Sequence, residues 1–305
     1  MISTARFSFI LMSLLVLSQV APAAEFELKD GDKVVWLGST LIEREQRYGY
    51  WEAALTARWP ERNVTFRNLG WSGDNVFGEA RLAFDITTPA LGLKRMVDLT
   101  LAEKPTVIFI CYGTNESFEG EAGLEKFEKG YEKLLDELKP AKARFVLMTP
   151  TPFEKHDRSL PDAKEANRRL SLYCAAIGKI ASKHNLTFAD LFTATNRGAL
   201  ENSQPSTENG LHLTPHGYMR TIPYLGSALG MKLSADIDEP LRRAIIAKNQ
   251  LYFYRWRPQN ETYLFGFRKH EQGRNGKEVA EFDPLVADKE KEIAELRVPK
   301  TAEKK

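Results

Sequence analysis

Cysteine is scarce in this chain, and so is any excess of charge of one sign. Among its 305 residues there are two cysteines, Cys111 and Cys174. One pair cannot staple a chain of this length, and both residues lie in apolar stretches, so we expect buried free thiols; a disulfide between them stays open. The 43 Lys and Arg nearly balance the 41 Asp and Glu. This balance argues against a nucleic-acid binder held by net positive charge.

The first residues also lack an apolar run long enough to span a bilayer. The run extends from Phe7 to Leu17, follows Arg6, and leads to an Ala-x-Ala sequence that ends at Ala23. A basic start, a short apolar core and small residues at a cleavage site are typical of a secretory signal peptide. We predict a signal peptide over residues 1–23, an exported mature protein (periplasmic or extracellular) and no stable membrane span after cleavage.

The next two hundred or so residues alternate between short apolar runs and segments with helical spacing. Strands separated by helices at this interval predict βαβ units with right-handed crossovers. We therefore expect a three-layer α/β/α domain over residues 30–232, built on a five-stranded parallel sheet. The expected strands are Val34–Leu37, Asn63–Asn68, Pro105–Cys111, Ala143–Thr149 and Leu186–Leu191.

The C-terminal part of the chain differs in composition. We predict a helix over 239–249 within an aromatic and basic arm at 233–283, followed by a charged helix and tail at 284–305. The aromatic side chains of the arm are expected to pack on the α/β domain. Two other roles stay open: a lid or subsite wall that stacks on sugar rings, and pairing of the charged tail with another subunit. Export and neutral charge argue against nucleic acid as a partner, and the oligomeric state is unknown.

Four loops carry reactive side chains, and three of them follow strands directly. In a parallel sheet such loops share the edge at the carboxyl ends of the strands. A hydroxyl nucleophile at this edge would need a base and donors for the oxyanion that forms. The alternative is a purely structural role, in which the Ser, Thr and Asn only cap helices. The loops are Gly38-Ser39-Thr40, Ser72-Gly73-Asp74, Gly113-Thr114-Asn115 and Glu208-Asn209-Gly210-Leu211-His212.

In order and spacing these four blocks resemble those of the SGNH (GDSL-type) hydrolases, over roughly Lys33 to Leu229. The resemblance implies a flavodoxin-like sheet and the chemistry of secreted esterases. It implies Thr40 at the nucleophile position, with Ser39 as the alternative. Gly73 and Asn115 match the oxyanion positions without change, and His212 matches the base.

The chain departs from the family pattern where catalysis is most demanding. Ser39 and Thr40 stand where the family has Asp-Ser, and Asn209 replaces the aspartate three residues before His212. A threonine nucleophile carries an extra methyl group that restricts χ1. An asparagine does not stabilise an imidazolium as a carboxylate does, although Glu208 could reach His212 instead.

The sequence thus leads to two functional hypotheses. The first is an exported ester hydrolase that removes small acyl groups, such as acetyl on carbohydrate, and needs no metal or organic cofactor. Its catalytic set is Thr40 or Ser39, His212 with Glu208 or Asn209, and the oxyanion donors Gly73 and Asn115. The second is a catalytically degenerate protein of the same fold that binds a glycan or a partner without turnover.

Overall fold

The computed structural model describes residues 26–82, 87–155, 159–160, 162–196 and 204–298. The predicted signal peptide lies outside the described residues. Five parallel strands form one sheet in the order β2-β1-β3-β4-β5, which confirms the predicted α/β fold with its parallel sheet. The strands are β1 (Lys33–Gly38), β2 (Thr65–Asn68), β3 (Val107–Cys111), β4 (Arg144–Met148) and β5 (Thr187–Ala189).

The two central strands are apolar because both of their faces are covered. All five residues of β3 are buried, as are all residues of β1 after Lys33. Their register pairs Gly38 with Cys111, so the two strands end side by side. A Cβ on Gly38 would lie 2.6 Å from the carbonyl oxygen of Cys111, and this close approach requires glycine.

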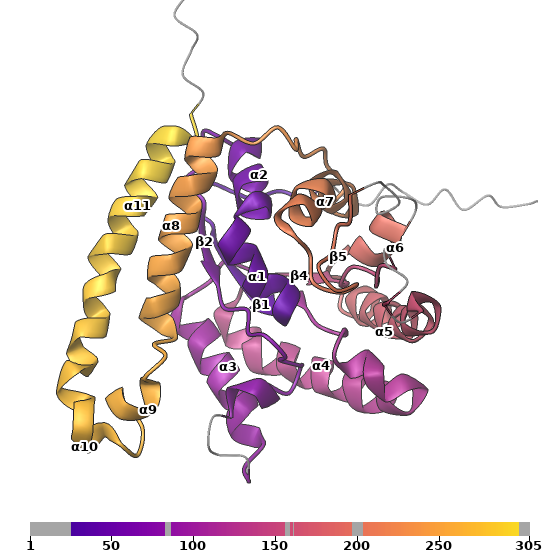
Figure 1. Ribbon diagram of the computed structural model, residues 1–305, viewed down its shortest axis with the longest axis horizontal. Coiled ribbons are helices and arrows are strands. Elements are labelled where there is room, and N and C mark those ends of the chain that lie inside the picture. Colours follow the sequence, from indigo (N-terminus) through magenta and orange to yellow (C-terminus); the bar gives the residue numbers. More distant parts are fainter. Residues whose placement is uncertain (1–25, 83–86, 156–158, 161, 197–203, 299–305) are drawn as a thin grey trace, which may run out of the picture.

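Helices cover both faces of the sheet, as Figure 1 shows. One hydrophobic core holds side chains from α1, α2 and α7, and the other holds side chains from α3, α4, α5 and the C-terminal helix α8 (Glu239–Trp256). The helices of the α/β domain are α1 (Thr40–Tyr48), α2 (Tyr50–Arg58), η1 (Glu79–Arg81), α3 (Ala90–Ala102), η2 (Glu116–Gly123), α4 (Leu124–Leu138), η3 (Lys139–Ala141), α5 (Ala163–Lys183), α6 (Leu191–Asn196) and α7 (Pro215–Ala228).

The C-terminal arm is a helical hairpin. Its long helices α8 (Glu239–Trp256) and α11 (Phe282–Leu296) pack side by side, with α9 (Glu261–Leu264), α10 (Lys269–Gln272) and η4 (Gly273–Glu281) at the turn. The helix predicted over 239–249 therefore continues through the aromatic segment. Tyr252 and Trp256, four residues apart on one helical face, are buried against the domain, whereas Phe265 and Phe267 are exposed.

The hairpin also covers the edge strand β2. The buried ammonium of Lys248 donates to the carbonyl oxygen of Phe66 at 3.0 Å and pairs with Glu52 at 2.7 Å. An edge strand leaves carbonyl groups without partners in the sheet, and α8 supplies one here. Cys111 and Cys174 are buried free thiols, as expected. Within the described segments, no helix has the length and apolar character needed to cross a membrane.

Candidate active site

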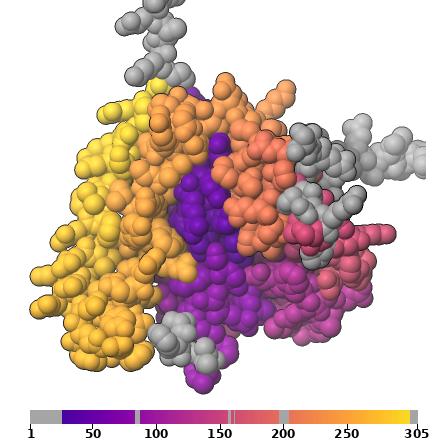
Figure 2. Space-filling model, viewed as in Figure 1, coloured from indigo at the N-terminus to yellow at the C-terminus, as the bar shows by residue number. Residues whose placement is uncertain are grey.

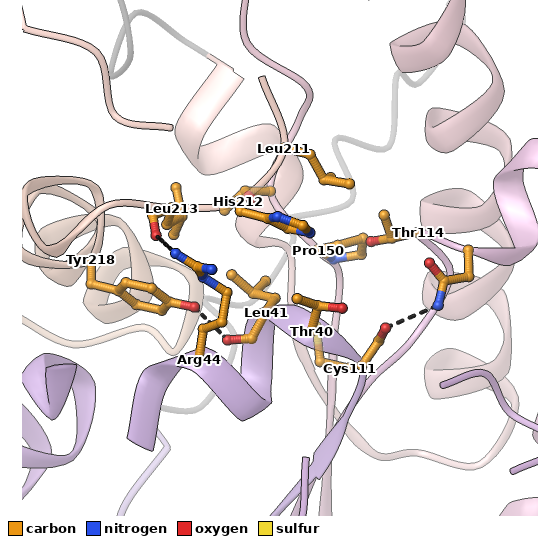
Figure 3. A pocket seen from close by; sticks show the side chains of 13 residues that line it. Thr40, Leu41, Arg44, Cys111, Thr114, Pro150, Leu211, His212, Leu213 and Tyr218 are labelled. Atoms are coloured by element: carbon orange, nitrogen blue, oxygen red, sulfur yellow. Dashed lines mark hydrogen bonds between the residues drawn. The ribbon is translucent and has the colours of Figure 1, made fainter. Parts of the chain in front are cut away.

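A small pocket lies at the carboxyl edge of the sheet, where three of the predicted loops meet. Thr40, Asn115 and His212 all line it, and Figure 3 shows the His212 ring above the Thr40 hydroxyl. Its volume is about 40 Å³; since one water needs on the order of 10–15 Å³ of such space, the pocket fits a group of a few heavy atoms. The other lining residues are Ser39, Leu41, Arg44, Cys111, Thr114, Pro150, Thr151, Leu211, Leu213 and Tyr218.

The two candidate nucleophiles begin helix α1. Ser39 is the N-cap residue, but its side chain makes no capping hydrogen bond. Helix capping therefore does not account for a hydroxyl group at this position. Ser39 is 6% exposed, whereas Thr40 is partly exposed to the pocket. As the first helical residue, Thr40 has a backbone N–H without an intrahelical partner. The positive end of the helix dipole also lies here, which favours an oxyanion.

Both predicted oxyanion donors contact these hydroxyls. The backbone N–H of Gly73, whose φ is 76°, donates to Oγ1 of Thr40 at 3.0 Å. Asn115 makes no side-chain cap; its Nδ2 donates to Oγ of Ser39 at 3.1 Å and to the carbonyl oxygen of Asp74 at 2.6 Å. The Asn115 amide therefore already contacts the Ser39 hydroxyl, as the Gly73 N–H contacts the Thr40 hydroxyl.

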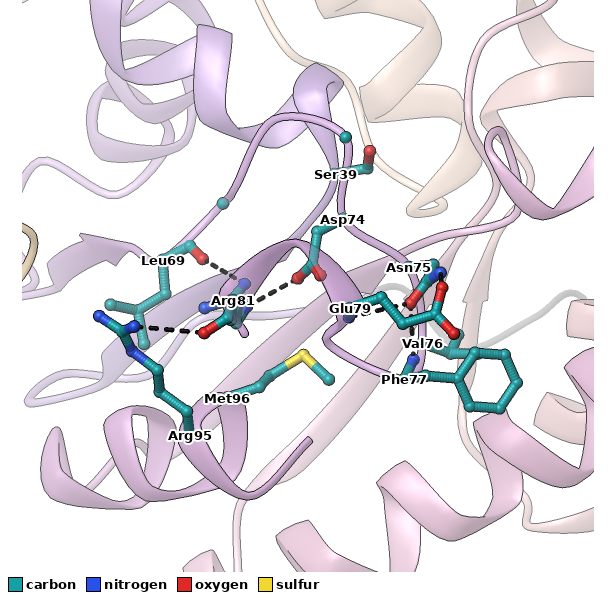
Figure 4. A network of polar contacts seen from close by, with 12 residues as sticks. Ser39, Leu69, Asp74, Asn75, Val76, Phe77, Glu79, Arg81, Arg95 and Met96 are labelled. Atoms are coloured by element: carbon teal, nitrogen blue, oxygen red, sulfur yellow. Dashed lines mark hydrogen bonds and ion pairs between the residues drawn. The ribbon is translucent and has the colours of Figure 1, made fainter. Parts of the chain in front are cut away.

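Buried charges fix the loops that carry these donors (Figure 4). Asp74 forms a fully buried ion pair with Arg81 at 2.7 Å, and Arg81 also donates to the carbonyl oxygen of Leu69. Glu116 accepts from the N–H groups of Val76 and Gly113, both at 2.9 Å. Burial raises the pKa of Glu116 to about 7. The loops after β2 and β3 are thus tied to each other beside the pocket.

His212 is held by a tight turn. Thr207 and Leu213 form an antiparallel bridge, and the carboxylate of Glu154 accepts from the N–H groups of Ser206 and Thr207. Nδ2 of Asn209 lies 3.3 Å from Nδ1 of His212.

The other contacts of Asn209 fix its orientation. Its Oδ1 accepts from the backbone N–H groups of Leu211 at 3.2 Å and His212 at 2.9 Å. The amide NH₂ therefore faces the imidazole, Nδ1 must act as an acceptor, and the proton of the neutral ring is assigned to Nε2. In this tautomer Nε2 is a donor, not a base.

Glu208, the other candidate orienting group, pairs with Arg44 at 2.5 Å. In the described part of the chain, no hydrogen bond joins Glu208 to the His212 ring, and none joins Thr40 to it. The pKa of His212 is lowered by burial and by the positive charge of Arg44, whereas Glu208 acts in the opposite direction. The site as it stands has a neutral imidazole beside a guanidinium.

The sequence interpretation missed Arg44 and Glu43. Arg44 follows Thr40 by four residues, so helical spacing places both on one face, and this signal could have revealed it. Glu43 is buried and accepts from the N–H and hydroxyl of Ser72, at 2.7 and 2.9 Å. His216, four residues after His212, does not line the pocket. Across the described residues, no group of three or more His, Cys, Asp or Glu side chains could hold a metal ion.

The comparison with protein families agrees with this architecture. The model of the GDSL-like lipase/acylhydrolase family matches residues 32–220, which is more than half of the chain. None of the curated proteins is a significant match. The matched segment ends before the α8–α11 hairpin.

Solved structures share the fold. A catalytic mutant of Axe2, an acetylxylan esterase from Geobacillus stearothermophilus, aligns with a TM-score of 0.52 and 19% identity, covering 68% of this chain and 98% of the esterase. A gut microbial diltiazem-metabolizing enzyme aligns with a TM-score of 0.50 and 18% identity, covering 67% of this chain and 48% of the enzyme. At these identities the likeness concerns the fold alone.

Proposed function

Because the chain belongs to the GDSL-like lipase/acylhydrolase family, we propose that it is an ester hydrolase acting on small acyl esters, with acetyl groups on carbohydrate as the substrate class. The observation that carries the proposal is the convergence of Thr40, Asn115 and His212 on one pocket, with the Gly73 N–H directed at the Thr40 hydroxyl. The small pocket volume suits an acetyl group, and the fold likeness to an acetylxylan esterase is consistent with it.

The proposed reaction begins with attack of Thr40 Oγ1 on the ester carbonyl carbon, while Nε2 of His212 takes the hydroxyl proton. The N–H groups of Gly73 and Thr40 and the Asn115 amide hold the oxyanion. The tetrahedral intermediate collapses, the C–O bond to the alcohol breaks, and His212 returns the proton to the leaving alkoxide. Water then attacks the acyl-threonine with His212 again as the base, which releases the acid and restores the hydroxyl.

This reaction requires Nε2 of His212 without a proton, and hence a proton on Nδ1. We propose that Glu208 leaves Arg44 and supplies the acceptor for Nδ1–H, and that the Asn209 NH₂ group, which now faces Nδ1, turns away from the ring. The turn supports this movement, because Glu208 and His212 face each other across it: the Glu208 N–H donates to the His212 carbonyl oxygen at 2.9 Å. The carboxylate of Glu208 is about half exposed, so solvent screens its side of the ion pair with Arg44, whose own side chain is 14% exposed.

A second candidate function is ligand binding without turnover. The contact between Asn209 and His212 favours it, because it leaves Nε2–H as a hydrogen-bond donor toward the pocket. A pocket lined by that donor, the Asn115 amide and the Thr40 hydroxyl can hold a carbonyl or hydroxyl group of a glycan. This candidate predicts binding at the same place with no acyl transfer.

Hydrolysis of a small activated acetyl ester by the mature protein separates the two candidates. Thr40→Ala, Ser39→Ala and His212→Ala are measured beside the wild type, and an acyl adduct is sought by mass spectrometry. Turnover that disappears in His212→Ala and Thr40→Ala, with an adduct on Thr40, supports the hydrolase. An adduct on Ser39 moves the nucleophile by one residue. If all four proteins hydrolyse the ester only at the background rate, the hydrolase is excluded and ligand binding without turnover remains.

Export of the mature protein is part of the proposal and is supported by the sequence pattern of residues 1–23. Expression of the full chain in a bacterium with a Sec pathway, followed by N-terminal sequencing, tests it. A mature N-terminus at Ala24 in the exported fraction is expected. An intact Met1 in the cytoplasm would contradict export without affecting the catalytic proposal.

A further inference from the structure

The C-terminal end of helix α8 packs against the loop that carries Gly73. Arg257 directly follows this helix, and its guanidinium carbon lies 3.5 Å from the centroid of the Trp71 ring. Trp256 packs edge-on against the same ring at 5.9 Å. Two consecutive residues of the hairpin thus contact the side chain that lies two positions before Gly73.

A second path joins Arg257 to the same loop through Glu43. Nη1 of Arg257 donates to Oε2 of Glu43 at 2.7 Å, and the Glu43 side chain is only 6% exposed. The two oxygens of Glu43 accept from the N–H and the hydroxyl of Ser72. Glu43 belongs to α1, the helix that begins at Thr40, so this network fixes the Gly73 loop relative to the candidate nucleophile.

We propose that Arg257 is a positioning residue for the oxyanion hole: through Trp71 and Glu43 it holds the Gly73 N–H on the Thr40 hydroxyl. A planar guanidinium can stack its face on an indole ring while its edge donates to a carboxylate, and an ammonium cannot do both. The hairpin lies beyond the family-matched residues 32–220. In this role it adds a residue to the active site that the matched segment does not contain. The kinetic consequence rests on the proposed function; the structural link does not.

The test compares Arg257→Gln with Glu290→Gln. Glu290, on α11, forms an ion pair of 2.5 Å with Arg67 of β2 and is also largely buried. It joins the hairpin to the domain and, within the described residues, makes no hydrogen bond or ion pair with Trp71, Ser72 or Gly73, so it controls for weakened docking. Hydrogen exchange of a peptide covering residues 69–76 reports loop order, and steady-state kinetics on the acetyl ester report catalysis. Arg257→Lys keeps the charge and tests whether stacking matters.

We expect faster exchange of the Ser72 and Gly73 amides in Arg257→Gln than in Glu290→Gln. We expect kcat to fall about 10- to 100-fold in Arg257→Gln, with KM nearly unchanged, because a donor displaced by about 1 Å loses most of its effect on the transition state. Arg257→Lys should recover part of this loss.

Equal exchange in the two Gln variants overturns the proposal, and so does an unchanged kcat in an active enzyme whose loop exchanges faster. If the wild type has no esterase activity, the proposed function fails, and faster exchange in Arg257→Gln alone still supports the structural link.

Discussion

Nδ2 of Asn209 occupies the place beside Nδ1 of His212 where the family pattern has a carboxylate, at a distance of 3.3 Å. A carboxylate there would accept a proton from Nδ1 and free Nε2 to act as a base. The amide instead donates to Nδ1, because its oxygen is already bound by two backbone N–H groups. This one contact decides which ring nitrogen carries the proton in the resting site.

Asn209→Asp should therefore increase ester hydrolysis. The new carboxylate can accept both from the backbone N–H groups and from Nδ1–H, so the ring takes the tautomer with a basic Nε2. The corresponding loss in a serine protease triad is about 10⁴-fold; because Glu208 already supplies part of the function in our proposal, we expect a gain of about 10-fold or more in kcat. Steady-state kinetics on the acetyl ester provide the measurement. A lower kcat in a folded variant would contradict this assignment of the proton.

Burial of His212, together with the charge of Arg44, should set the acidic limit of activity. Burial and Arg44 lower the pKa of His212 below its ordinary value of 6.5. A base works only when neutral, so the midpoint of the acidic decline in kcat/KM should lie below pH 6.5.

Arg44→Met removes the positive charge and leaves Glu208 next to the ring, so the pKa of His212 should rise and the acidic limb should move to higher pH. Profiles of kcat/KM between about pH 5 and pH 8 give the comparison. Lys139→Met, which removes an exposed cation paired with Asp136, should leave the limb in place. A limb that does not move in Arg44→Met, or moves to lower pH, would count against His212 as the base.

Asn115→Ala should lower kcat about 10²- to 10³-fold with little change in KM, since an oxyanion donor acts mainly in the transition state. Ser39→Ala is the matched control, because it removes the group that now accepts from Asn115 and leaves the amide free for an oxyanion. Comparable losses in both variants would identify Ser39 as a participant rather than a bystander. Thermal unfolding of Asn115→Ala checks that the loss of its bond to Asp74 has not unfolded the site.

The sheet and the positions of the loops could be predicted because they depend on local patterns. Gly38 ends one apolar run and Gly113 lies just beyond another, and parallel strands bring their carboxyl ends to one edge. The same logic placed Thr40, Gly73 and Asn115 together. His212 required the family resemblance, since spacing alone does not say where a loop between β5 and α7 will fold.

Other features depend on partners distant in sequence, and no local pattern reveals them. In the sequence, nothing distinguishes Glu43 from other acidic residues of a helix. Its partner Arg257 lies 214 positions away, and only the fold brings the two together. The spacing of Glu208 from His212 would allow the carboxylate to reach the ring. It pairs with Arg44 instead, and this contact depends on the tertiary structure. Likewise, the prediction that the aromatic segment is an arm did not show that α8 continues through it, because the helix there is stabilised by burial of Tyr252 and Trp256 rather than by propensity.

The last prediction concerns stability and the buried carboxyl group of Glu45. Its Oε1 accepts from the N–H groups of Trp51 at 2.7 Å and Glu52 at 3.0 Å. Its Oε2 has no partner in the described residues and is buried. Burial is the main cause that raises the pKa of Glu45 from 4.5 to about 8. The folded protein therefore holds a proton on Glu45 at neutral pH, and Oε2 is the oxygen free to carry it.

Between the two pKa values, about 4.5 unfolded and about 8 folded, the folded state binds a proton that the unfolded state has lost. The contribution of Glu45 to the free energy of unfolding is thus complete below pH 4.5 and declines as the pH rises toward 8. Glu45→Gln removes this decline, since the amide oxygen can accept from the same two N–H groups and the NH₂ group replaces the protonated oxygen. Glu137→Gln makes the same change at an exposed position. Melting temperatures measured near pH 5 and pH 8 should differ less in Glu45→Gln than in the wild type and Glu137→Gln; equal differences in all three proteins would mean that Glu45 is ionised in the fold.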